Sequence, residues 1–191
     1  MAGAFPPKSK LHHHTPAWVP TGGLFHIRIR CDRSQLTRMP LTDPGLGPTL
    51  LNSVNLYHAT GRWWCHLFLL MPDHLHSLIA FPPHEGMSHV IGEWKHYHAS
   101  QNRVAWQEGY FDHRIRNDHE LELKVGYIRE NPVVKNLSAS AGDWLWVWEL
   151  SRSAWGGPGA PRPASEPTPL PLQPDDPSSQ ASRARSARPT P

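Results

Sequence analysis

Residues 62–81, RWWCHLFLLMPDHLHSLIAF, decide the fold of this 191-residue chain. Residues 62–71 are a nearly continuous run of aromatic and aliphatic side chains, which is typical of a strand buried on both faces. Pro72-Asp73 favours a turn, and residues 74–81 return as a second apolar strand. The stretch therefore predicts a hairpin at the centre of a sheet.

The flanking segments predict a β-α-β-β-α-β order followed by one more helix. Residues 24–31 alternate apolar and polar side chains with a period of two, as a half-buried strand does. Residues 87–101 carry apolar side chains at helical spacing. The other expected elements are a Pro/Gly-rich loop at 40–48, a helix at 50–60, a strand at 110–115 and a helix at 119–131 that Pro132 ends. The fold class is α+β: a ferredoxin-like or RRM-like sandwich, with an antiparallel four-stranded sheet, helices on one face and an added C-terminal helix.

Composition sets the domain limits. Ten of the 21 prolines lie in residues 156–191, which contain no Phe, Tyr, Trp, Ile, Val or Met. A segment with so little apolar surface cannot offset the entropy of ordering itself. We expect a flexible N-terminal arm at 1–17, one folded domain at 18–150 and a disordered Pro-rich tail at 151–191.

Charge and cysteine content exclude several classes of protein. Residues 1–155 hold 15 Lys and Arg against 13 Asp and Glu, a balance that permits nucleic-acid binding without requiring it. Cys31 and Cys65 form neither a metal motif nor a disulfide framework. The sequence has no run of 18 apolar residues and no signal-peptide core, so we expect a cytosolic protein without a membrane partner.

The first group of chemically active residues is His74-Leu75-His76. Residues i and i+2 of a strand point to the same side, so the two imidazoles share a face while Leu75 points into the opposite layer. Two neighbouring imidazoles can chelate a divalent ion, and Asp73 stands beside them. Two strand histidines held by hydrogen bonds are the alternative. His96 and His98 have the same spacing but lie on a predicted helix, where such positions do not face each other.

The second group lies on the last predicted helix. Its apolar stripe is Leu121, Val125 and Ile128, and the adjoining polar face carries Glu120, Lys124, Tyr127 and Asn131. A lone tyrosine on such a helix is usually a packing residue. An amine and an amide oxygen on the same side make Tyr127 a candidate nucleophile.

These groups resemble those of the REP-associated tyrosine transposases, in the HUH single-tyrosine transposase superfamily. Three blocks carry the resemblance, in the same order and with the same spacing: Leu70–His76, Ala105–Arg116 and Tyr127–Val133. Together with a tryptophan-rich piece at 143–148, they extend the resemblance over about residues 16–148.

The resemblance implies a role for each matching position. His74 and His76 match the two histidines that bind a divalent ion, Mg²⁺ or Mn²⁺, and Asn131 matches the third metal ligand. Tyr127 matches the catalytic tyrosine, which cleaves single-stranded DNA through a 5′-phosphotyrosine link. The implied partner is a palindromic repeat folded into a hairpin, to which the protein would bind at the nucleoid, and a homodimer is left open. Candidate DNA contacts are Lys95, Arg103, His113, Arg114, Arg116, Lys124 and Arg129.

Two other functions fit parts of the sequence. A non-catalytic ferredoxin-like module for single-stranded nucleic acid would expose aromatic side chains on its sheet and give Tyr127 no reason to face the histidines. A zinc-dependent hydrolase using His74, His76 and Asp73 would need a further strong ligand and a general base, and neither has a partner at fixed spacing.

Overall fold

The computed structural model describes residues 23–83 and 85–150. The predicted arm at 1–17 and tail at 151–191 lie outside this range. The elements it contains are β1 (Leu24–Arg30), α1 (Arg33–Arg38), α2 (Leu46–Ala59), β2 (Trp64–Leu70), β3 (His74–Ala80), α3 (Met87–Gln101), β4 (Phe111–Arg114), α4 (Asp118–Val134), a 3₁₀ turn (Ala141–Asp143) and β5 (Val147–Glu149). In this part of the chain, no helix is long and apolar enough to cross a membrane.

The five strands form one sheet in the order β4-β1-β3-β2-β5, and each neighbouring pair is antiparallel. The central hairpin is β2–β3, as predicted, and the first four strands follow the ferredoxin-like order. The sheet has five strands rather than the predicted four because β5 pairs with β2. With three residues, β5 is too short to show a period of two in the sequence.

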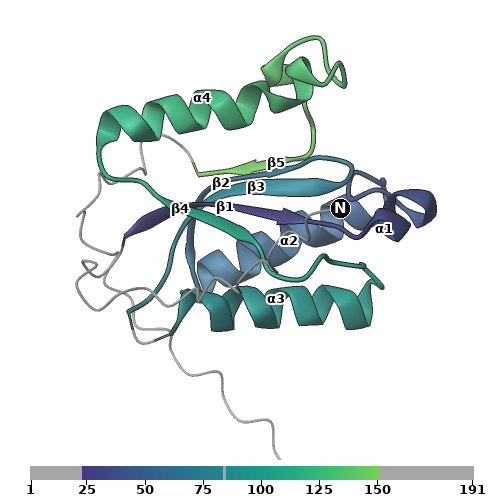
Figure 1. Cartoon of the computed structure of the whole chain (residues 1–191), viewed down its shortest axis with the longest axis horizontal. Helices are drawn as coiled ribbons and strands as arrows, with labels where there is room; N and C mark the ends of the chain where they lie inside the picture. Colours follow the sequence, from purple (N-terminus) through teal and green to yellow (C-terminus); the bar gives the residue numbers. More distant parts are fainter. Residues whose placement is uncertain (1–22, 84, 151–191) are drawn as a thin grey trace, which may run out of the picture.

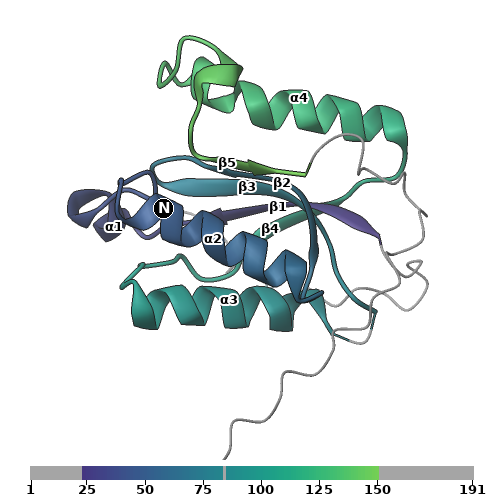
Figure 2. The same ribbon diagram turned by 180° about the vertical axis from the view of Figure 1, so that it is seen from behind.

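Helices cover both faces of the sheet. Figures 1 and 2 show α2 and α3 packed on one face and α4 lying across the other. The larger core lies on the α2–α3 side and includes Phe68, Leu75 and Trp94. On the α4 side, Leu121, Val125 and Ile128 pack on strand residues, which confirms the predicted apolar stripe of the last helix.

Two predicted helix boundaries are wrong, both at prolines. Helix α4 continues through Pro132 to Val134, because Pro132 is buried as the next member of the apolar stripe. A proline near a helix end removes one hydrogen bond, and here the burial offsets that loss. Helix α2 begins at Leu46, inside the predicted loop, because Pro48 falls in the first turn, where its missing N–H costs little.

Short elements complete the molecule. Asp32 caps α1, a six-residue helix that the sequence did not reveal, by accepting a hydrogen bond from the Ser34 N–H. Gly47 on α2 lies against the ring of Trp146, and a side chain at 47 would come within 2.4 Å of that ring. Trp146 therefore packs closely on α2 just before β5.

Stability should fall in acid because of His98, a fully buried residue of α3. Burial lowers the pKa of its imidazole to about 4, and its ring nitrogens contact Ser53 Oγ and Asn102 Nδ2, each at 2.8 Å. In the unfolded chain the pKa returns to 6.5, so the unfolded state binds a proton that the folded state does not. The stabilisation is complete above pH 6.5 and is lost between 6.5 and 4, at up to about 1.4 kcal/mol per pH unit. Urea unfolding at a series of pH values checks this, and His98→Gln should reduce the slope; an unchanged slope would count against it.

Candidate active site

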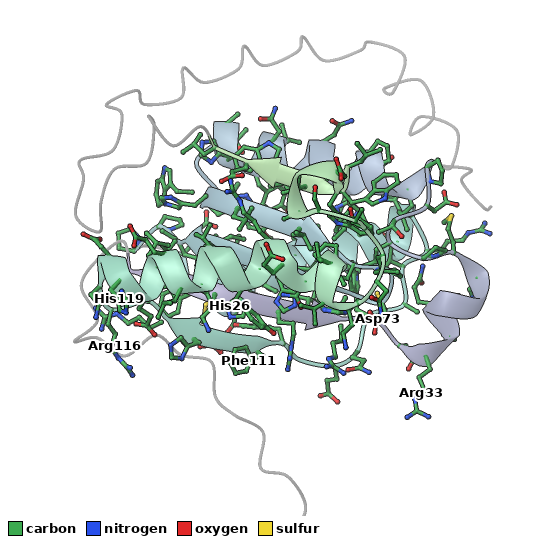
Figure 3. All side chains as sticks on the ribbon, turned by 90° about the horizontal axis from the view of Figure 1, so that it is seen from above. His26, Arg33, Asp73, Phe111, Arg116 and His119 are labelled. Atoms are coloured by element: carbon green, nitrogen blue, oxygen red, sulfur yellow. The ribbon has the colours of Figure 1, made fainter. Side chains whose placement is uncertain are left out.

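A cleft of about 610 Å³ opens between the C-terminal half of α4 and the sheet, where β1 ends and β3 begins. Figure 3 shows Asp73 at this end of α4, with His119 and Arg116 at the other. The lining residues are Arg28, Arg30, Met71, Pro72, Asp73, His74, His76, Tyr127, Asn131, Lys135 and Leu137. The cleft thus brings together all four residues predicted for catalysis and metal binding.

His74 and His76 begin β3 and point to the α4 side of the sheet. Their Nε2 atoms lie 3.1 Å apart, while Leu75 points into the core on the opposite face. Alternation along the strand produces this arrangement, as the sequence predicted.

Each histidine is held through its other ring nitrogen. His74 Nδ1 lies 2.6 Å from the Asp73 carboxylate, and His76 Nδ1 lies 3.0 Å from His26 Nε2. His26 comes from β1 and was not predicted as a site residue. The signal was present, because His26 belongs to the polar phase of the alternating strand 24–31.

Burial keeps these imidazoles neutral at physiological pH. Desolvation lowers the pKa of His76 to about 2, helped by the neighbouring His74, His26, Arg28 and Arg30. Desolvation also lowers the pKa of His26 to about 4 and that of His74, against the opposing effect of Asp73. A neutral imidazole has a lone pair available for a metal ion.

Tyr127 lies directly over the histidines. Its ring makes edge-to-face contacts with His76 and His26, at centroid distances of 5.8 and 6.2 Å. Half of the residue is exposed, and Lys124 Nζ lies 5.5 Å from the ring centroid. The helix therefore presents an accessible tyrosine to the histidine pair.

Asn131 lies one helical turn after Tyr127 and lines the same cleft. Its Nδ2 donates a hydrogen bond of 2.7 Å to the Tyr127 carbonyl. Because this bond uses the amide nitrogen, the amide oxygen is the atom available to a ligand.

Cations dominate the charge of the cleft. Arg28, Arg30 and Lys135 line it, and Asp73 is its one carboxylate among the described residues. The two arginines occupy the same polar phase of β1 as His26, and the sequence did not single out any of the three cations. Such a cleft favours an anionic ligand.

None of the seven predicted DNA contacts lines this cleft. Lys95 on α3 donates hydrogen bonds to the carbonyls of Gln107 and Gly109, both at 2.9 Å, and Arg103 is exposed in the loop after α3. Arg129 pairs with Glu149 and ties α4 to β5.

Three of these contacts lie on or just after β4. His113 Nε2 lies 2.5 Å from Glu120 Oε1, and the Arg116 N–H donates to Glu120 Oε2. Arg114 pairs in register with Phe25, which packs in the α2–α3 core, so its side chain leaves the sheet away from Tyr127. Lys124 lies beside the tyrosine, with its Nζ 5.5 Å from the ring centroid.

Two imidazoles and an amide oxygen fit Mg²⁺ or Mn²⁺, and Mn²⁺ accepts imidazole more readily. Cis ligands of an octahedral ion with metal–ligand distances of about 2.1 Å lie about 3 Å apart, close to the observed Nε2 separation. Polar partners on the remote nitrogens, as seen here, are the usual support of metal-binding histidines. Within residues 23–83 and 85–150, no three His, Cys, Asp or Glu side chains are grouped to hold a metal. The resemblance implies the Asn131 oxygen as the third protein ligand, and Asn131 lines the same cleft as the two histidines.

Known proteins match this chain in sequence and in fold, although no family model matches it. It is 28% identical over 82 residues to the REP-associated tyrosine transposase of Escherichia coli (strain K12), a match that covers 40% of this chain. The chain spans about half of that relative, since the match covers 48% of its length. A solved structure of the REP-associated tyrosine transposase bound to a REP hairpin matches with a TM-score of 0.57 and 21% identity, over 66% of this chain and 76% of that one. The resemblance to the REP-associated tyrosine transposases is therefore confirmed, in sequence over these 82 residues and in fold over about two thirds of the chain.

Proposed function

We propose that this protein is a DNA transposase that cleaves and rejoins single-stranded DNA through a covalent link to Tyr127. The observation that carries the proposal is the position of Tyr127, whose ring lies 5.8 Å from that of His76 in a cation-lined cleft. Its ring lies over the histidines of its own chain, which supports cleavage in cis, whether the protein is a monomer or a homodimer.

The proposed reaction has two steps, strand cleavage and strand rejoining. Tyr127 Oη attacks a backbone phosphorus as it loses its proton, the P–O3′ bond breaks, and the 3′ oxygen leaves as a hydroxyl. The DNA 5′-phosphate is then joined to the tyrosine. In the second step a 3′-hydroxyl attacks the same phosphorus, the P–Oη bond breaks, and the tyrosine regains a proton.

Other residues of the cleft would bind the metal ion and the phosphate. His74, His76 and Asn131 would hold Mg²⁺ or Mn²⁺, which when bound supplies Lewis-acid stabilisation of the phosphate. Arg28 and Arg30 would bind the non-bridging phosphate oxygens and keep the phosphorus facing Tyr127. Lys124, whose Nζ lies 5.5 Å from the Tyr127 ring centroid, would bind a phosphate of the strand beside the tyrosine.

A hairpin of single-stranded DNA is the proposed substrate. The structural relative was solved with a REP hairpin, and the cations of this cleft suit a phosphate backbone. Phe111 on the edge strand β4 adds an exposed aromatic ring, and Arg28 lies 5.3 Å from its centroid. Unpaired bases stack on such rings.

The two alternatives have less support. A non-catalytic module leaves unexplained why Tyr127 contacts the histidines, and α4 covers the sheet face on which that module would bind bases. A zinc hydrolase needs a third strong ligand, which the described residues do not offer to His74 and His76.

A covalent-adduct assay tests the proposal. The protein is incubated with Mn²⁺ and a labelled single-stranded hairpin, then run on a denaturing gel. We expect a labelled band at the mass of protein plus DNA fragment, which EDTA abolishes. Absence of an adduct over a panel of hairpins, with DNA binding intact, would favour the non-catalytic module.

Arg30 and Lys95 form a matched pair for the DNA-binding surface. Arg30→Gln removes a cation from the cleft, so it should weaken single-stranded DNA binding and reduce the slope of log K against log salt by about 1. Lys95→Gln removes the same charge elsewhere, so it should leave binding unchanged and lower stability, because two loop carbonyls lose their donor. Fluorescence anisotropy at several salt concentrations measures both. If both variants lost the same affinity, the DNA would not bind preferentially at the cleft.

A further inference from the structure

His26 is an unexpected residue for its position on β1. It is 4% exposed, at a point where its partners in register are Leu78 and His113. Its ring lies edge to edge with that of His76, with centroids 5.2 Å apart and an interplanar angle of 15°. Among the described residues, its Nδ1 is buried without a hydrogen-bond partner. Burying a polar atom in this way costs free energy, so packing alone does not explain this histidine.

The hydrogen bonds in this row of side chains are interdependent. Asp73 accepts from His74 Nδ1–H, so the neutral His74 ring has a lone pair on Nε2. The 3.1 Å contact between the two Nε2 atoms then requires the proton of His76 on Nε2. His76 Nδ1 is thereby an acceptor for His26 Nε2–H, at 3.0 Å. Each ring therefore donates to the next acceptor in the same direction, from His26 through His76 and His74 to Asp73.

A cation held by His74 and His76 reverses part of this row. Both Nε2 lone pairs are then used, so the proton of His76 must lie on Nδ1 and point at His26 Nε2. His26 can accept this bond when its own proton lies on Nδ1. The His26 Nε2 proton would pass to His76 Nδ1, while water takes the proton from His76 Nε2 and supplies one to His26 Nδ1, so each ring keeps one proton and no net proton is released.

We propose that His26 is a positioning residue for the metal site: it holds the His76 ring with Nε2 toward His74 and serves as donor or acceptor as the site empties or fills. This role rests on the metal site of the proposed function. A ring without this partner is free to turn, which would move Nε2 away from the ion. Loss of such support typically weakens metal binding by 10- to 100-fold.

Titration of the full-length protein with Mn²⁺ alone, by calorimetry, tests this role without DNA or activity. His26→Phe keeps a ring but cannot hydrogen-bond, so its Kd for Mn²⁺ should rise by about 10- to 100-fold. Its melting temperature should fall only slightly, because the unpartnered His26 Nδ1 is removed while His76 Nδ1 loses its partner. His26→Gln places an amide that can turn to donate or accept, so it should bind Mn²⁺ within a few-fold of the wild type.

Several outcomes would overturn the role. If His26→Phe binds Mn²⁺ as tightly as the wild type, His26 is a packing residue. If the wild type itself binds no Mn²⁺, the proposed metal site is wrong and the role of His26 fails with it, whereas tight binding by His26→Phe overturns the role of His26 alone. Imidazole ¹⁵N spectra of the wild type give a second test that needs no variant: saturating Mg²⁺ should shift the ring nitrogens of His76 and His26 together. Unchanged His26 nitrogens would exclude the exchange.

Discussion

Replacing Tyr127 with Phe is expected to abolish strand cleavage and the covalent protein–DNA adduct while leaving DNA binding close to wild type. The hydroxyl oxygen is the atom that would bond to phosphorus, and Phe removes that atom alone. The ring remains, so its contacts with His76 and His26 persist. We expect the free energy of unfolding to change by no more than about 1 kcal/mol, the scale of one hydrogen bond.

The other tyrosines provide the controls. Tyr97 on α3 is 51% exposed, the same fraction as Tyr127, but faces away from the histidine pair. Tyr97→Phe should cleave normally. Tyr110 is a poor alternative nucleophile, because burial raises the pKa of its phenol to about 12 and its hydroxyl contacts Ser88 Oγ at 3.0 Å. A Tyr127→Phe protein that still becomes attached to DNA would refute the assignment.

Loss of either paired histidine is the second large effect expected. His74→Ala and His76→Ala should each abolish metal-dependent cleavage, because one imidazole and the Asn131 oxygen cannot hold the ion at physiological concentrations. Both proteins should fold. His76→Ala should be the less stable, by about 1–3 kcal/mol, since it removes a buried ring and leaves His26 Nε2 without its partner.

The control for this pair is His89→Ala. His89 lies on α3, its side chain is 63% exposed, and it does not line the cleft. It should retain full activity and Mn²⁺ binding. The metal role would be wrong if EDTA and both paired-histidine substitutions left cleavage unchanged in proteins shown to be folded by circular dichroism.

Most of the sheet could be predicted because its long strands have apolar runs or apolar–polar alternation that can be recognised in the sequence. The run at 62–71 and the alternation at 24–31 yield β2 and β1 within two residues at each end. The helix ends predicted at prolines were wrong because the local sequence does not show what else the proline contacts. The backbone cost of a proline is local and known, whereas the compensating burial of Pro132 depends on the sheet beneath it.

Some residues of the candidate site could be predicted from the sequence and others could not. Spacing along one element brought together His74 with His76, and Tyr127 with Asn131. His26, Arg28 and Arg30 join them only because β1 pairs with β3, in a register that sets Arg28 opposite His76 and Arg30 opposite His74. Pairing across about 46 residues is invisible to local patterns. Lys95 stays a predicted DNA contact, and its ammonium group donates hydrogen bonds to two loop carbonyls, which no local pattern in the sequence could show.

Attachment of DNA to Tyr127 is tested most directly by mass spectrometry of the covalent adduct after digestion with nuclease and trypsin. Trypsin cuts after Lys124 and after Arg129, so Tyr127 lies in the peptide VGYIR, residues 125–129. We expect this peptide to carry a nucleotide joined through its 5′-phosphate to the tyrosine oxygen. A nucleotide on any other residue, or a link through the 3′-phosphate, would contradict it.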